Sequence, residues 1–154
     1  MTTEQLLREF KKIYKETKDL VNEFPQEKRE EILFDKWSLK DVLAHFSNWV
    51  EHDLSCFRAL EEGKEPFWVP NIDEYNKQGV LDRENKKWED IYAEFSMLFN
   101  QLIIKYETLP ENLWGEKFWG SREFTPRKFL EGDIKHLGKD HLPQLKKVKT
   151  MVKR

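Results

Sequence analysis

Hydrophobic residues recur at three- and four-residue spacing along four long segments of the chain, which is the pattern of amphipathic helices. The segments cover residues 3–24, 39–62, 88–106 and 126–154. Pro25 follows the first segment, Gly63 follows the second and Pro110 lies just beyond the third. These residue types commonly end helices, so the pattern predicts four helices with defined stops.

Helix-start signals support the second and fourth segments. The sequence Ser38-Leu-Lys-Asp41 resembles a capping box with Asp in place of Glu, and Thr125-Pro126 combines an N-cap residue with proline at the first helical position. No segment has a convincing strand pattern. We therefore expect an all-α four-helix bundle, folded as a single domain over residues 1–154.

The connection between the second and third helices is longer than a simple bundle needs. It runs from Gly63 to about Asn85, contains Phe67 and Trp68, and has room for a short helix around residues 72–78. Long connections that carry aromatic residues either cover a core or form part of a binding site. Both alternatives stay open from the sequence.

Composition excludes several classes of function. The 154 residues are 38% hydrophobic and 36% charged, with a formal net charge of −2, so no excess of positive charge is available to bind nucleic acid. The apolar runs are too short for a membrane span, and the first ten residues lack the apolar core of a signal peptide. The single cysteine, Cys56, fits a reducing compartment. We expect a cytoplasmic protein that binds neither membrane nor nucleic acid.

The second helix carries most of the candidate chemistry. His45, His52 and Cys56 lie together on one edge of its apolar face, beside Trp49. Asp53 falls near the middle of that face, so it faces either a wet cavity or a partner. Cys56 is a weak candidate nucleophile, because a cysteine at such a position is more often a small buried apolar residue.

On the fourth helix, His141 lies in the middle of the apolar face, whereas His136 lies well off that face if the helix is regular. Two helices that each present a histidine inward favour a shared site. Neutral imidazoles suit zinc, nickel or iron, and a catalytic site needs about three protein ligands.

The string from Trp37 to Trp49, WSLKDVLAHFSNW, resembles the start of the second helix in the DinB-like (YfiT-like) four-helix-bundle superfamily, which includes the ClbS/DfsB group. The segments 73–76, 88–106, 109–113, 125–126 and 141–144 follow the same order, so the resemblance covers nearly the whole chain. It implies a metal site made by one histidine of the second helix and an H-x-x-x-H pair on the fourth. His45 matches the first ligand and His141 matches the last.

The middle ligand of that set is interrupted, because the position four residues before His141 is Leu137. His136 is one residue further away, at a spacing of five. A regular helix, which needs no special assumption and is the slightly favoured alternative, turns His136 toward solvent and leaves an incomplete site. Pro143 removes one helical hydrogen bond, and a π-bulge in the preceding turn would let a spacing of five bring both histidines to one face.

Three functions remain open. The first is a metal-dependent hydrolase or thiol transferase for a small molecule, with His45, His136 and His141 as metal ligands and Asp53 or Asp133 orienting ligands or moving protons. The second is a metal-free ClbS/DfsB-like protein that binds or hydrolyses a reactive small molecule. The third is a helical bundle that associates with other proteins and has no catalytic activity. A homodimer is reasonable under any of the three.

The aromatic connections predict a pocket. We expect the segments Phe67-Trp68 and 114–119 to converge at the end of the bundle near His45. The residues predicted to contact a substrate there are Trp49, His52, Trp68 and Trp119.

Overall fold

The computed structural model describes residues 1–152, which are mostly helical, so the predicted all-α class is confirmed in this broad sense. The chain forms two compact units. Unit 1 contains residues 1–42 and 130–152, and unit 2 contains residues 43–129. The arrangement of all four helices as one bundle stays a prediction.

The first helix, α1 (Thr3–Glu23), has the predicted bounds to within a residue. Thr2 accepts a hydrogen bond from the Gln5 backbone N–H, and the Gln5 side chain accepts one from the Thr2 backbone N–H, which closes a capping box. The helix ends at Glu23, and its C-cap Phe24 has extended backbone directly before Pro25. Its buried stripe has the expected spacing: Leu6, Phe10, Ile13, Tyr14, Thr17 and Val21.

A short antiparallel hairpin separates α1 from the next helix, so the prediction that the chain has no strand is wrong. β1 (Ile32–Phe34) pairs with β2 (Trp37–Ser38). Asp35, in the turn, has a φ of 61°, and a short polar side chain is one of the few that tolerate this left-handed conformation. Strands of two or three residues are too short to show an alternating pattern in the sequence.

The second helix, α2 (Leu39–Glu61), begins at the predicted capping box. Asp41 N–H donates to Ser38 Oγ at 3.1 Å, and Ser38 N–H donates to the Asp41 carboxylate at 3.0 Å. At the other end Gly63 has a φ of 71°, the left-handed conformation that ends a helix at little cost for glycine. Both end signals are therefore confirmed.

The long connection contains the predicted short helix, α3 (Ile72–Leu81), capped by Asn71. It packs closely on α2, because a Cβ added at Gly79 would lie 2.3 Å from Asn48 Cγ. α4 (Trp88–Thr108) follows and contacts α2 through phenylalanines. The Phe46 ring lies 6.2 Å from that of Phe95, centroid to centroid. Unit 2 is therefore built on α2, with α3 and α4 against it.

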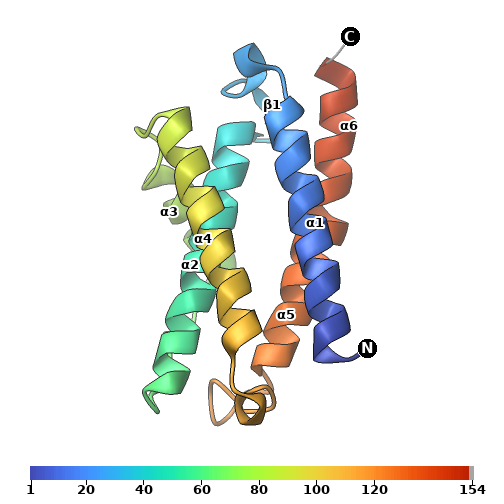
Figure 1. The fold of residues 1–154 in the computed structure, drawn as a ribbon. Coiled ribbons are helices and arrows are strands. Elements are labelled where there is room, and N and C mark those ends of the chain that lie inside the picture. Colours follow the sequence, from blue (N-terminus) through green and yellow to red (C-terminus); the bar gives the residue numbers. More distant parts are fainter. Residues whose placement is uncertain (153–154) are drawn as a thin grey trace. The chain divides into compact units, whose positions relative to one another are not determined.

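The predicted fourth helix consists of three consecutive segments: α5 (Pro126–Lys135), the π-helical segment η3 (His136–His141) and α6 (Leu142–Val152). The Thr125 hydroxyl accepts from Lys128 N–H at 3.2 Å, which confirms the predicted cap. In unit 1, η3 and α6 pack along α1 (Figure 1). The continuation of the fourth helix through residues 153–154 lies outside the described residues.

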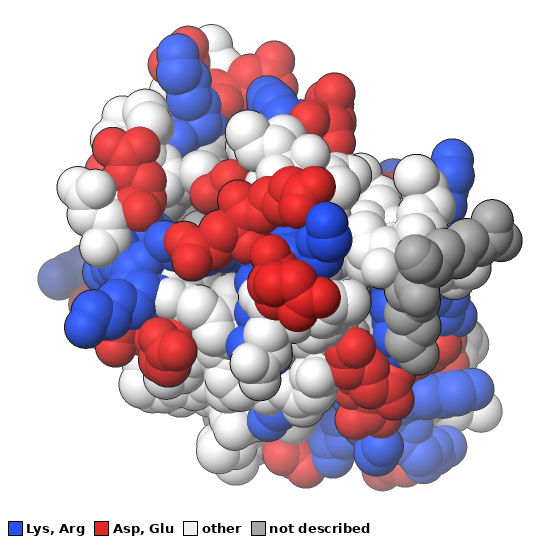
Figure 2. Space-filling view, turned by 90° about the horizontal axis from the view of Figure 1, so that it is seen from above, with Lys and Arg blue, Asp and Glu red and all other residues white. Residues whose placement is uncertain are grey.

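Lys and Arg side chains are interspersed with Asp and Glu side chains on the face seen in Figure 2, and neither sign covers it. This agrees with the near balance of 27 basic and 29 acidic residues. Among residues 1–152, no helix has both the length and the apolar character needed to cross a membrane.

Candidate functional site

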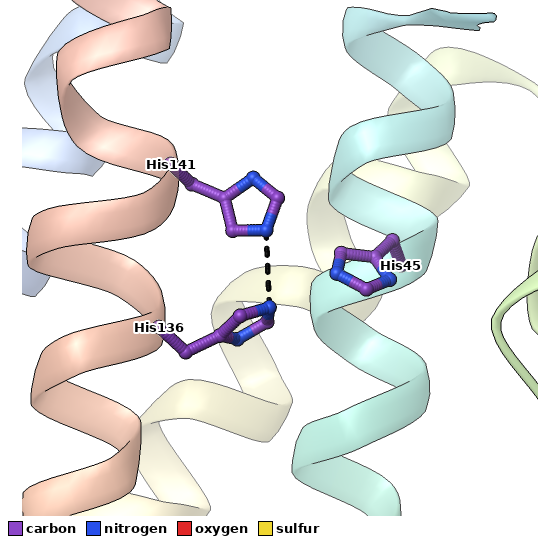
Figure 3. Close-up of side chains that lie close together, drawn as sticks. All are labelled: His45, His136 and His141. Carbon is purple, nitrogen blue, oxygen red and sulfur yellow. Dashed lines mark hydrogen bonds between the residues drawn. The ribbon is translucent and has the colours of Figure 1, made fainter. Parts of the chain in front are cut away.

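The π-helical segment η3 brings His136 and His141 together. Their Nε2 atoms lie 3.0 Å apart and the two rings are perpendicular, with centroids separated by 4.5 Å (Figure 3). In this contact one ring donates its Nε2–H and the other accepts with its lone pair. The slightly favoured expectation of a regular helix, with His136 facing solvent, is therefore wrong.

The backbone explains how a spacing of five places two side chains on one face. Leu142 N–H bonds to the carbonyl oxygen of Leu137, five residues earlier, where an α-helix would bond four residues back. Pro143 follows directly and has no N–H, so the carbonyl of Lys139 receives no α-helical bond from it. The wider turn holds one extra residue, and His136 and His141 stand one above the other.

Burial keeps both imidazoles neutral. Burial and, to a smaller extent, the neighbouring His136 together lower the pKa of His141 to about 4, although Asp140 acts in the opposite sense. Burial also lowers the pKa of His136, again against the effect of Asp140. A neutral imidazole has one nitrogen lone pair to give to a metal ion, so neutrality favours metal binding. The ring that donates Nε2–H would have to carry its proton on Nδ1 instead for both Nε2 atoms to act as ligands.

His45, the third predicted ligand, belongs to unit 2. It lies on α2, is 4% exposed, and its ring centroid is 5.9 Å from that of Phe46. A buried polar ring in this position, next to a phenylalanine, is costly unless a polar group or an ion satisfies it.

The carboxyl groups have different surroundings. Asp133 is half-buried on α5, one turn before His136. Asp140, which the sequence reasoning missed, is the carboxylate whose charge acts on both imidazoles, and it lies 3.8 Å from the Lys135 ammonium. Its position within the extra-wide turn could have been inferred only once the π-helical spacing was known.

A second group of predicted residues surrounds a cavity of about 220 Å³ in unit 2. Trp68 and Trp119 meet edge to face with centroids 5.1 Å apart, as the predicted convergence of the two aromatic connections requires. Residues from α2, α3, both connections and the start of α5 line the cavity: Trp49, His52, Asp53, Trp68, Val69, Ile72, Trp119, Phe124 and Phe129.

Two parts of the pocket prediction are wrong. Phe67 is 65% exposed and lies outside this cavity, and Trp114 stacks on Tyr106, with centroids 5.8 Å apart. The reasoning also missed Phe124 and Phe129. Their positions just before and inside α5 gave no sign that they reach the same place as residues from α2.

Asp53, the acidic residue in the apolar arc of α2, is 8% exposed and lines this cavity. His52, at the edge of the apolar face of α2, is buried, with 9% of its surface exposed. Burial lowers the pKa of His52, and the ring lies 3.5 Å from the Cys56 sulfur. Burial raises the pKa of that thiol to about 12, so Cys56 is a small buried residue and not a ready nucleophile.

Comparison with family models, with curated proteins and with solved structures gives no match for the chain. The resemblance to the DinB-like superfamily therefore rests on the sequence motifs alone. The residues brought together within a unit are the histidine pair of unit 1 and the aromatic cavity of unit 2.

Proposed function

We propose that His45, His136 and His141 bind one divalent metal ion, and that the protein is a metal-dependent enzyme acting on a small molecule. The contact between His136 and His141 in η3 carries this proposal. The three histidines together make up a group of side chains that could hold a metal ion, which supports it.

The donor chemistry fits such an ion. Two nitrogens that each lie about 2.0–2.1 Å from one ion are about 2.9–3.4 Å apart at ligand angles of roughly 90–110°. The 3.0 Å separation of the two Nε2 atoms falls in this range. Three imidazoles without a thiolate favour zinc, nickel or iron, and leave a coordination position open for a substrate.

The chain's own residues have separable roles in this proposal. His136 and His141 give their ligand atoms from one turn, so η3 fixes their spacing. Asp140, next to the pair, holds negative charge near the imidazoles and stabilises bound metal. Asp53 or Asp133 orients ligands or moves protons. The metal, when bound, supplies Lewis-acid activation of a water or thiol nucleophile.

Metal analysis of protein purified without a histidine tag tests the metal proposal. We expect close to one zinc, nickel or iron per chain, and a large loss of affinity in His45→Ala, His136→Ala and His141→Ala. His52→Ala is the matched control, because it removes the remaining histidine and should keep the metal. Protein that neither contains nor binds these metals, or an equal loss in His52→Ala, would contradict the proposal.

The reaction class needs a separate assay. Hydrolysis of 4-nitrophenyl acetate that requires added metal and disappears in His141→Ala would support a hydrolase. Metal-dependent conjugation of a thiol to 1-chloro-2,4-dinitrobenzene would support a thiol transferase. If neither reaction depends on the metal, the remaining alternatives are a metal-free binding protein and an interaction bundle. The aromatic cavity of unit 2 favours the former, because it needs no metal to bind a ligand.

A further inference from the structure

The aromatic cavity of unit 2 is rigidly built. Trp119 Nε1–H donates to the carbonyl oxygen of Pro66 at 2.7 Å, and Trp49 Nε1–H donates to Asn76 Oδ1 at 2.5 Å. Both indole N–H groups are therefore satisfied by the protein. The rings line the cavity with carbon surface, and their orientation is fixed before any ligand binds.

One acidic group interrupts this aromatic lining. Asp53 is 8% exposed and lines the same cavity as Trp68 and Trp119. The other titratable group of the lining is His52, and burial lowers its pKa, so it stays neutral near pH 7. The lining therefore combines aromatic faces, which carry negative charge density, with a carboxyl group, and both attract a cation.

The protein already contains one example of a cation on this aromatic surface. The guanidinium carbon of Arg122 lies 3.5 Å from the centroid of the Trp68 ring. Arg122 is not among the residues that line the cavity. Trp68 thus accepts a cation from the chain itself while it also forms part of the cavity wall.

The volume of the cavity and the residues at its opening restrict the size and shape of a ligand that can bind there. Its volume of about 220 Å³ is small for a ligand site, since such sites span roughly 300–1,000 Å³. Ile72 and Phe124 are 59% and 41% exposed, so they form an apolar rim that faces solvent. A single ring with a short charged arm suits this space.

We propose that this cavity binds a small organic cation, an arylalkylamine in its ammonium form, with the ammonium group between Asp53 and the Trp68 ring and the ligand's own ring beside Trp119 and Phe124. The proposal does not depend on bound metal, because none of its residues is a proposed metal ligand. If Asp53 binds the ammonium group, Asp133 is left as the carboxylate for the metal site.

Calorimetric titration of the full-length protein, freed of metal by a chelator, tests the charge requirement. The probes are 2-phenylethylammonium, the neutral 2-phenylethanol and the anionic 3-phenylpropanoate, which share a ring and differ in charge. We expect the cation to bind at least about tenfold more tightly than the alcohol, and the anion to bind more weakly than the alcohol. Equal affinity for cation and alcohol, or no binding of any probe, would overturn the proposal.

Variants locate the effect. Asp53→Asn should reduce the ratio of cation to alcohol affinity to about one, whereas Asp90→Asn, an exposed change on α4, should leave it intact. Trp68→Leu keeps apolar surface but removes the aromatic face, so it should weaken the cation at least about threefold more than the alcohol. Trp68→Leu therefore tests the cation proposal even if Asp53→Asn does not fold. An unchanged ratio in Asp53→Asn, or equal losses in Trp68→Leu, would contradict the proposal.

Discussion

Deletion of Lys139 should leave the fold intact, because the π-helical turn contains one residue more than an α-helical turn. Lys139 is exposed and lies within η3, between His136 and His141. Removing it changes the histidine spacing from five to four. The segment can then become regular α-helix, with both histidines still on one face and the flanking helices still in phase.

The deletion would cause a large loss of stability if η3 were instead regular α-helix. If the segment were already regular, the deletion would turn all later residues by about 100° around the helix axis. Leu142, Leu145 and Val148 are 5%, 2% and 7% exposed, and all three would leave their buried positions. Burial of each such side chain contributes about 1.5–3 kcal/mol, so the loss would be about 4.5–9 kcal/mol. A typical domain has only about 5–15 kcal/mol of stability in total.

Thermal unfolding followed by circular dichroism separates the two outcomes. Deletion of Lys12, another exposed lysine, is the matched control, because α1 is regular there and Leu6 and Phe10 would rotate out of the core. That control should lose about 3–6 kcal/mol. The Lys139 deletion should lose no more than about 1 kcal/mol, a shift in Tm of about 4 °C or less. Equal destabilisation by the two deletions would refute the role assigned to η3.

Three further changes give distinct expectations. Leu137→His creates a histidine four residues before His141, but it replaces a side chain that is 2% exposed. It should therefore lower the free energy of unfolding by about 2–5 kcal/mol without a gain in metal affinity. Tighter zinc binding in a chelator competition would mean that His136 is not a ligand. Gly79→Ala should lower Tm, because the new Cβ would lie 2.3 Å from Asn48 Cγ and would push that side chain away. This overpacking costs about 1–3 kcal/mol, which is more than the gain in helix propensity of up to about 1 kcal/mol. A raised Tm would contradict the close packing of α3 on α2. The pKa of His141 is about 4 in the folded metal-free protein against 6.5 for an unperturbed imidazole, so the unfolded chain takes up a proton first as the pH falls. The free energy of unfolding from urea titration should therefore fall as pH drops from about 6.5 to 4, and the fall should be shallower in His141→Asn. An identical slope in the two proteins would refute the neutral buried state of His141.

The helix ends could be predicted because their causes are local. The Ser38 capping box, the left-handed Gly63 and the Thr125 cap each depend on residues within a few positions of one another. Such contacts are encoded by short motifs whatever the rest of the chain does.

The sequence alone could not decide whether the fourth helix is regular or contains a π-bulge. Pro143 and the five-residue histidine spacing indicated that a π-bulge was possible, yet the choice depends on packing of the whole segment. η3 packs closely on α1 at Gly138, because a Cβ there would lie 2.8 Å from Ile13 Cδ1. The cavity residues Phe124 and Phe129 were missed for a related reason, since their neighbours in space are far away in sequence.

X-ray absorption at the zinc edge tests the three-histidine centre most directly, because it reports the ligands around the ion itself. The zinc-loaded protein should show nitrogen ligands at about 2.0–2.1 Å with the scattering pattern of three imidazoles. His45→Ala should show two imidazoles, and His52→Ala should be unchanged from the natural protein. A spectrum that does not change in His45→Ala, or that shows sulfur ligation, would contradict a centre formed by His45, His136 and His141.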